Sequence, residues 1–307
     1  MAVVTTGFFD GVHLGHRHVI ETVVSSARER GEEAIVVTFW PHPRTVLQQD
    51  ARDFRILNTL EEKKALLLAL GVDRVEVLPF TREFAALTAE QYLQMLHDKF
   101  DASLIVMGYD NRIGCDQKSF KELEAYCFLN PSDLRSSSLP TSLRAVGPLP
   151  FMWPRAATGS GEQHASISST QIRNALMNGD VATANEMLGY EYTLTGAVVA
   201  GNRLGRTIGF PTANMQLYEP LKLVPGNGVY SVEAEVLGVR YKGMCNIGVR
   251  PTVNGTGRTI ETHILDFDQD IYGLPLTLRF LRRIRDERKF GSLDQLREQL
   301  LLDRAAV

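Results

Sequence analysis

The hydrophobic residues in the first half of the chain follow two alternating patterns. Residues 3–8 and 34–39 are short apolar runs rich in β-branched side chains, which are typical of buried strands. Between them, apolar residues recur at helical spacing until Gly31, a residue type that commonly ends a helix. The pattern therefore predicts a strand, a helix and a second strand.

The same alternation continues to about residue 108. Capping boxes that begin at Thr59 and Thr88 predict two more helix starts. Residues 74–78 and 104–108 are predicted to be strands. Repeated strand–helix units predict an α/β domain with a parallel sheet, in which ligands bind beyond the carboxyl ends of the strands.

From about residue 189 the pattern changes to strands alone. Strands are predicted at residues 230–236, 240–247, 259–267 and 276–284. Short strands with one apolar face, joined by tight turns such as Leu237-Gly238, indicate a small antiparallel barrel. We place the domain boundary near Leu188, which divides the chain into domains 1–188 and 189–307.

Two segments stand apart from these patterns. A capping box at Ser292 predicts a C-terminal helix. Its leucines are expected to form a stripe that packs on the barrel: Leu293, Leu296, Leu300 and Leu301. Residues 129–165 are rich in proline, serine and glycine and are predicted to be mostly irregular.

Composition restricts the function classes without choosing one. The 307-residue chain has 44% hydrophobic and 22% charged residues, and its formal net charge of -3 provides no general basic field for nucleic acid. It has no secretory leader pattern and no apolar run long enough to cross a bilayer, so we expect a cytoplasmic protein that binds no membrane. The three cysteines, Cys115, Cys127 and Cys245, form no CxxC pair and are expected to be reduced thiols. We expect a monomer or weak self-association.

Residues 201–214 combine glycines and cations with a proline and a terminal Thr-x-Asn. We expect neither a helix nor an ordinary strand there, but backbone wrapped closely around phosphate and a metal ion. The candidate ligands are Gly201, Gly205, Arg206, Gly209, Pro211, Thr212 and Asn214. The run lacks the ending of a Walker A loop, so it would hold a nucleotide by another design. The alternative is a glycine-rich surface loop.

A second candidate phosphate site follows the first predicted strand. His13 and His16 lie three residues apart at the start of the predicted helix, a spacing that brings their imidazoles to one side. The first-turn amides and the helix dipole favour an anion such as a triphosphate. Further candidates for ATP contact are Gly7, Phe8, Asp10 and Gly15. The alternatives are a glycine turn with exposed histidines and a less favoured zinc site with His42.

A third element is the segment from Ser168 to Arg173. Ser168 and Gln171 satisfy the capping-box rule, so this segment alone is explained by a helix start. Arg173 would add a fixed cation beside free first-turn amides, which suits a transferring phosphoryl group. We therefore include Ser169, Thr170 and Arg173 among the candidate site residues.

These motifs carry a family resemblance. Segments 7–16, 38–43, 168–173, 205–214 and 258–263 occur in the order expected of the bacterial bifunctional riboflavin kinase/FMN adenylyltransferases, the prokaryotic FAD synthetases. The chain resembles this family over nearly its whole length. The resemblance implies a Rossmann-like nucleotidyltransferase domain followed by a six-stranded riboflavin kinase barrel, with riboflavin, FMN, FAD and ATP as substrates and products.

The resemblance also implies roles for residues of the second domain. Mg-ATP would bind to the run 201–214, with Thr212 and Asn214 contacting Mg²⁺ and phosphates. Glu261 would be the base that accepts the proton of the riboflavin 5'-hydroxyl, and strand alternation places it on the same side as His263. Phe210 is a candidate flavin contact.

In the first domain, FMN would attack the α-phosphate of ATP and release pyrophosphate. The resemblance implies that His13 and His16 hold the phosphates, that Ser169, Thr170 and Arg173 close the far side, and that Asp110 lies near nucleotide and flavin. A turn or cap carboxylate is the alternative for Asp110.

The segment after Asp110 departs from the family pattern. Residues 111–117 replace an aromatic-rich motif, and residues 129–165 replace the strand expected next. A narrower alternative therefore keeps the kinase and has weakened or lost adenylylation. A non-enzymatic flavin- or nucleotide-binding module would need neither Glu261 nor the metal ligands. A basic run, Arg279, Arg282, Arg283 and Arg285, makes nucleic-acid binding a distant alternative, and we interpret it as a solvated strand edge.

Overall fold

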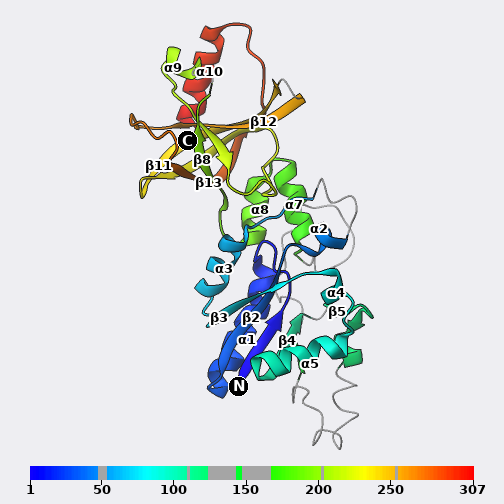
Figure 1. Cartoon of the computed structure of the whole chain (residues 1–307). Coiled ribbons are helices and arrows are strands. Elements are labelled where there is room, and N and C mark those ends of the chain that lie inside the picture. The colour runs from blue at the N-terminus through cyan, green and yellow to red at the C-terminus, as the bar shows by residue number, and fades with distance from the viewer. Residues whose placement is uncertain (48–53, 109–110, 124–142, 147–166, 202–203, 253–254) are drawn as a thin grey trace, which may run out of the picture. The chain divides into compact units, whose positions relative to one another are not determined.

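The computed structural model of the 307-residue chain describes all residues except 48–53, 109–110, 124–142, 147–166, 202–203 and 253–254. The chain divides into two compact units (Figure 1). The first comprises Met1–Phe54 and Asn58–Ser168, and the second comprises Arg55–Leu57 and Ser169–Val307. Each unit is described by itself.

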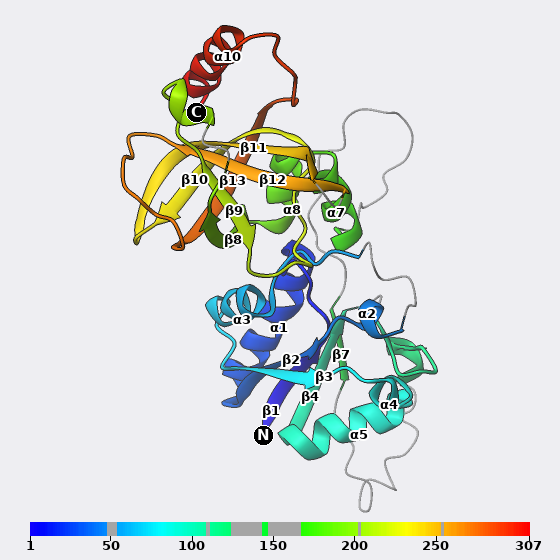
Figure 2. The same ribbon diagram turned by 45° about the horizontal axis from the view of Figure 1, so that its top comes forward.

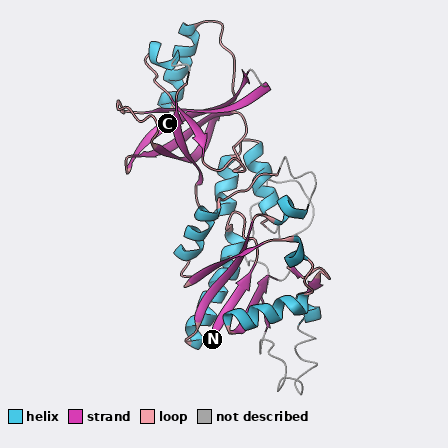
Figure 3. Ribbon diagram, viewed as in Figure 1, coloured by secondary structure: helices cyan, strands magenta, loops and turns pink. Residues whose placement is uncertain are grey.

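The first unit is built on a five-stranded parallel sheet with the order β3-β2-β1-β4-β7. Its strands are β1 (Ala2–Thr6), β2 (Glu33–Trp40), β3 (Arg74–Pro79), β4 (Ala102–Gly108) and β7 (Leu143–Val146). The predicted parallel sheet is confirmed, and Figure 3 shows the strands of this unit in magenta with helices in cyan.

Helices cover both faces of this sheet because alternate strand residues point to opposite sides. Val4 packs with residues of α5 (Ala89–Phe100), whereas Val3 packs with residues of α1 (Leu14–Arg30). Helix α3 (Leu60–Ala69) joins α1 through the buried Leu67. Two short helices complete this unit in the described part of the chain: α2 (Pro43–Leu47) and α4 (Arg82–Ala85).

The predicted helix ends are confirmed by their caps. Thr59 and Thr88 both form complete capping boxes, at the starts of α3 and α5. Gly31 ends α1 in the left-handed conformation with φ 66°, which glycine adopts without steric cost. The sequence was sufficient to predict these helix ends because each cap forms its hydrogen bonds within four residues.

The prediction that residues 129–165 replace the strand expected next is wrong. Strand β7 lies inside this segment and pairs in parallel with β4, from Ile105 opposite Leu143 to Gly108 opposite Val146. The strand expected after β4 is therefore present. Nearby, β5 (Arg112–Ile113) and β6 (Lys118–Ser119) form a two-stranded hairpin.

The second unit contains a closed barrel of six antiparallel strands in the order β10-β11-β12-β9-β8-β13 (Figure 2). The strands are β8 (Tyr192–Val199), β9 (Ala213–Leu217), β10 (Gly228–Val236), β11 (Val239–Thr252), β12 (Gly255–Ile264) and β13 (Pro275–Arg285). The predicted six-stranded barrel is confirmed. Hydrophobic patterning had identified four of these strands but not β8 and β9, and β12 ends at Ile264 rather than at residue 267.

Helices α7 (Ser169–Met177) and α8 (Val181–Leu188) belong to the compact unit of the barrel. Asn185 of α8 donates to the Phe280 carbonyl of β13 and accepts from the Tyr192 amide of β8, each over 2.8 Å. The boundary near Leu188, which separates two functions, stays a prediction.

The C-terminal helix α10 (Leu293–Ala305) begins at Ser292, whose hydroxyl accepts from the Gln295 amide. Leu296 and Leu300 line a cavity of the barrel unit, but Leu293 and Leu301 are about half exposed, at 50% and 51%. The predicted leucine stripe is therefore wrong at two of its four positions. In the part of the chain that the structure describes, no helix combines the length and the apolar character needed to cross a bilayer.

The interpretation of the basic run as a solvated strand edge is also wrong, because its arginines bind partners within the barrel unit. Arg279 pairs with Glu235 over 3.1 Å, and Arg282 donates to the Ala306 carbonyl. Arg285 forms a bidentate ion pair with Asp303, whose side chain is 1% exposed. This pair attaches α10 to the end of β13.

Replacing Asp303 with alanine is expected to lower the free energy of unfolding of the barrel unit by about 3 kcal/mol, since one charge of a buried ion pair would remain without its partner. Urea denaturation of the full chain would measure the effect. Glu298→Ala, on the exposed side of the same helix, is the matched control. A shift no larger than that of the control would contradict a structural role for the pair.

Candidate functional sites

The segment between β1 and α1 forms a tight loop with an unusual backbone. Phe9 and Val12 have φ values of 50° and 37°, although neither is glycine. Such residues persist only where their surroundings hold them in place, and they concentrate at functional sites. The loop lies at the carboxyl end of β1, where the parallel sheet was expected to bind ligands.

His13 and His16 lie together at this loop, as predicted from their spacing. Their rings stack with centroids 3.6 Å apart, and the His13 ring accepts from the His16 amide as the N-cap of α1. Burial lowers the pKa of His16 well below its usual value, and the positive potential of His13 and Lys63 lowers it further. His16 is therefore neutral near pH 7, and a bound polyanion would favour its protonation.

Lys63 is a component of this loop that the sequence analysis missed. Its side chain is buried, and its ammonium group donates to the Phe8 carbonyl over 3.0 Å and to the Thr38 hydroxyl over 2.9 Å. It also lies 4.0 Å from the centre of the Phe8 ring. Desolvation lowers its pKa from 10.5 to about 8, although Asp10 opposes the shift. Lys63 thus joins the ends of β1 and β2 beneath the histidine loop.

The lowered pKa of Lys63 predicts a distinctive pH dependence of stability. Between about pH 8 and 10.5 the folded lysine has lost a proton that the unfolded chain still binds, so the free energy of unfolding must rise with pH. Relative to Lys63→Met, the wild-type protein should gain about 3 kcal/mol across this range. Denaturant titrations at several pH values would measure it, with Lys64→Met as control. Parallel pH dependences of wild type and Lys63→Met would contradict the shift.

Most of the other predicted residues of this loop contact neighbouring residues of the first unit. Asp10 is 3% exposed and accepts from the Asn58 amide over 3.2 Å. Gly7 donates to the Val37 carbonyl of β2, and Gly15 is the second residue of α1. Phe8 holds Lys63 through its carbonyl and its ring.

Ser169, Thr170 and Arg173 lie in the first two turns of α7. Arg173 donates through Nε to the Arg55 carbonyl over 2.9 Å, within the barrel unit. Their roles beside the histidines stay predictions from the family resemblance. Asp110 lies outside the described residues.

The glycine-rich run contains a short helix, α9 (Leu204–Thr207), and its last residues begin β9, so the expectation of neither helix nor strand is wrong. The close backbone approach that was expected does occur. A side chain at Gly201 would collide with the Asn214 carboxamide, and Gly209 has φ 85°. Because Gly201 has no side chain, it leaves room for the Asn214 carboxamide.

One row of directly opposed residues crosses the barrel through Asn214. Strand register pairs them in the order Val199, Asn214, Glu261, Asn246, Val229 and Arg285. Directly opposed residues present their side chains on the same face of a sheet. Register thus places Asn214 and Glu261 side by side, although they are 47 positions apart in the sequence.

Four residues of this row line a cavity of about 230 Å³: Glu261, Asn246, Val229 and Arg285. One part of the lining is apolar and includes Ile208, Phe210, Met244, Phe290, Leu296 and Leu300. The other part is polar and includes Thr212, His263, Glu287 and Arg288. The cavity therefore suits a ligand with an apolar body and a polar extension.

Phe210 and His263 connect the glycine-rich run to this cavity. Phe210 is 5% exposed and meets the His263 ring edge to face, with centroids 5.1 Å apart. His263 makes a 2.8 Å hydrogen bond to the Pro211 carbonyl, and burial lowers its pKa. As expected from strand alternation, Glu261 and His263 share one face.

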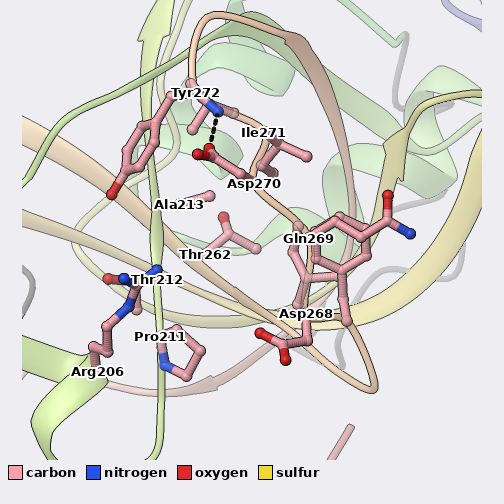
Figure 4. Close-up of a pocket in the computed structure, with 13 residues that line it drawn as sticks. Arg206, Pro211, Thr212, Ala213, Thr262, Asp268, Gln269, Asp270, Ile271 and Tyr272 are labelled. Carbon is pink, nitrogen blue, oxygen red and sulfur yellow. Dashed lines mark hydrogen bonds between the residues drawn. The ribbon is translucent and has the colours of Figure 1, made fainter.

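A smaller cavity of about 80 Å³ lies on the other side of Thr212, which lines both cavities. Figure 4 shows Arg206, Pro211 and Thr212 on one side of it and the loop residues Asp268 to Tyr272 around the rest. In this loop the Tyr272 amide donates to the Asp270 carboxylate over 3.1 Å. Two neighbouring cavities separated by Thr212 can place two ligands end to end.

The sequence analysis identified the glycine-rich run and Glu261 but missed other residues that line these cavities. Asn246 is a polar residue inside an otherwise buried stretch of β11, which is a signal that could have been used. The loop 268–272 and the segment 287–290 carry no periodic pattern. Only the closure of the barrel brings them together with the run 201–214.

Comparisons with known proteins agree with this geometry. The profile of the riboflavin kinase family matches residues 188–307, and the FAD synthetase profile matches residues 1–131. The bifunctional riboflavin kinase/FMN adenylyltransferase of Bacillus subtilis is 37% identical over 306 residues, covering 99% of this chain and 90% of that protein. The chain belongs to this bifunctional family. The Escherichia coli K12 member is 35% identical over 303 residues, covering 98% of this chain and 90% of its own.

A solved structure supports the same fold over the whole chain. It is described as a macrolide-efflux protein from Streptococcus pneumoniae, is 34% identical, and has a TM-score of 0.86 with coverage of 99% of this chain and 92% of that chain. The efflux description applies to that protein alone. The matches to both family profiles show that this chain contains a riboflavin kinase part and an FAD synthetase part.

Proposed function

We propose that the barrel unit phosphorylates riboflavin in its two adjacent cavities, with Thr212 between them. The isoalloxazine ring would pack against the apolar lining formed by Phe210 and the leucines of α10. The ribityl chain would extend past the polar row to Glu261. The nucleotide would occupy the smaller cavity, where Arg206 supplies a cation for its phosphates.

The donor set at the start of β9 fits a magnesium ion. The Thr212 hydroxyl and Asn214 carboxamide offer the hard oxygen ligands that Mg²⁺ prefers, together with nucleotide phosphates and water. Among the residues with a described placement, no group of three His, Cys, Asp or Glu side chains could form a metal site of its own. When bound, the ion would neutralise phosphate charge.

Glu261 is the proposed general base. Its carboxylate can accept the proton of the terminal ribityl hydroxyl as that oxygen attacks the γ-phosphorus. Phosphoryl transfer depends chiefly on positioning and charge stabilisation, so the register that aligns Asn214 with Glu261 matters as much as the base itself.

In the first unit, we propose that the stacked histidines hold the phosphates of ATP while FMN attacks the α-phosphorus. A neutral His16 donates one N–H, and protonation on binding the polyanion would add a charge where pyrophosphate leaves. Lys63 would keep the loop in place. We propose that Ser169, Thr170 and Arg173 contribute from α7 and that Asp110 contributes near the flavin.

The placement of Glu261, Asn214 and Thr212 at one point of the barrel is the observation that carries the proposal. Purified protein with riboflavin, excess ATP and Mg²⁺ should yield FMN and then FAD, as separated by chromatography. Absence of both products would overturn the proposal. FMN that accumulates without FAD would overturn the part assigned to the histidine loop.

The proposed function also bears on the location of the enzyme in the cell and on its partners. Because both reactions consume ATP, we propose that the enzyme works in the cytoplasm. A monomeric or weakly self-associating state, without nucleic acid or membrane partners, stays a prediction that light scattering in the presence and absence of these partners would test.

A further inference from the structure

Asn246 is a polar residue in an unusual position. It lies within β11, where its neighbours Met244, Cys245, Ile247 and Gly248 are all buried. Asn246 itself is half-buried, and its side chain lines the larger cavity. A carboxamide at such a position loses hydration and is normally compensated by hydrogen bonds.

The Asn246 carboxamide makes no hydrogen bond to another residue among those that the structure describes. Strand register places it directly opposite Glu261, and opposed side chains on one face have Cβ atoms about 5 Å apart. Both side chains reach the same cavity. The amide therefore lines the same space as Glu261, the proposed general base.

The chemistry along this row matches a chain of hydroxyl groups. An ionised Glu261 can only accept hydrogen bonds, and Arg285, beyond Val229, can only donate them. The carboxamide of Asn246 can do both, as a hydroxyl group also requires. The bidentate pair with Asp303 keeps Arg285 fixed, so Asn246 is the member of the row best suited to exchange hydrogen bonds with a polyol.

We propose that Asn246 is a specificity-determining residue of the kinase reaction, whose carboxamide hydrogen-bonds the secondary hydroxyl groups of the ribityl chain and so orients the terminal hydroxyl toward Glu261. The proposal rests on the assignment of riboflavin to the larger cavity. It concerns recognition of the polyol, which neither the apolar lining nor the general base can provide.

The test compares riboflavin with an isoalloxazine that carries a 5-hydroxypentyl chain, which keeps the terminal hydroxyl and lacks the other three. A site built to hydrogen-bond hydroxyl groups rejects an analogue without them, so the wild-type enzyme should prefer riboflavin by at least about 100-fold in kcat/KM. Asn246→Leu keeps the approximate size of the side chain. It should lose activity mainly on riboflavin, and the preference should fall below about 5-fold.

Gln216→Leu removes an exposed carboxamide from β9 and is the matched control, which should retain the wild-type preference. Equal losses on both substrates in Asn246→Leu would overturn the proposal, because they would indicate a role in barrel structure or in Glu261 alone. If Asn246→Leu does not fold by circular dichroism, Asn246→Ala, which also lacks a donor and an acceptor, replaces it, and an unchanged preference in that variant would overturn the proposal. Failure of the wild type to phosphorylate either flavin would instead refute the assigned kinase function.

Discussion

Replacing Glu261 with glutamine is expected to reduce FMN formation from riboflavin by at least about 100-fold, while FAD formation from supplied FMN continues at the wild-type rate. The substitution keeps the size of the side chain and removes its negative charge and its capacity to accept a proton. Because Glu261 lies in the barrel unit and the histidine loop lies in the other unit, the two reactions should respond separately. Initial rates of both reactions, measured by chromatography of the flavins, check this result.

Glu233→Gln is the matched control, since Glu233 is a carboxylate of β10 that forms a surface ion pair with Arg240. It should leave both rates unchanged. Loss of both activities in Glu261→Gln would contradict the assignment of the two reactions to separate units. Full retention of FMN formation would show that Glu261 is not the general base.

Replacing His16 with alanine is expected to produce the converse pattern. FAD formation from FMN should fall about 100-fold, since a donor directed at developing phosphate charge would be lost, while riboflavin phosphorylation should persist. The pKa of His16 is held well below its usual value in the free protein. Binding of a polyanion should raise it, which NMR titration of the imidazole with and without pyrophosphate would measure.

His18→Ala is the matched control, because His18 lies in the same helix two residues further on. It should affect neither reaction. Equal FAD formation by His16→Ala and by wild type would contradict a phosphate-binding role for the stacked pair, and loss of the kinase as well would indicate that the substitution disturbs the fold.

The sequence predicted best the features whose causes are local. The capping boxes of Thr59 and Thr88 and the left-handed Gly31 are each decided within one helical turn, and all three occur as expected. The position of His13 and His16 at the start of a helix was likewise predictable from the strand–loop–helix pattern. Their stacking follows from the three-residue spacing.

Features that depend on distant partners were missed or predicted wrongly. Strand β7 was hidden in a segment whose composition indicates irregular structure, because its pairing with β4 determines its conformation. Strand β9 begins inside a run of turn-forming residues and is held between β8 and β12. Lys63 carries no sequence signal of burial, and only the fold brings its ammonium group to the carbonyl of Phe8.

The two cysteines among the described residues differ in burial. Cys245 is buried in β11, and burial raises its pKa to about 12. Cys115, in contrast, is exposed, which the sequence did not predict. Cys127 lies outside the described residues.

The central claim is that one chain carries two independent catalytic sites that act in series. Mixing the Glu261→Gln and His16→Ala variants tests it most directly, because each variant should lack one reaction and supply the other. With riboflavin, ATP and Mg²⁺, neither variant alone should form FAD beyond trace amounts, whereas the mixture should form it through FMN released by His16→Ala. A mixture that forms no more FAD than the separate variants, while each retains its own single reaction, would contradict the account.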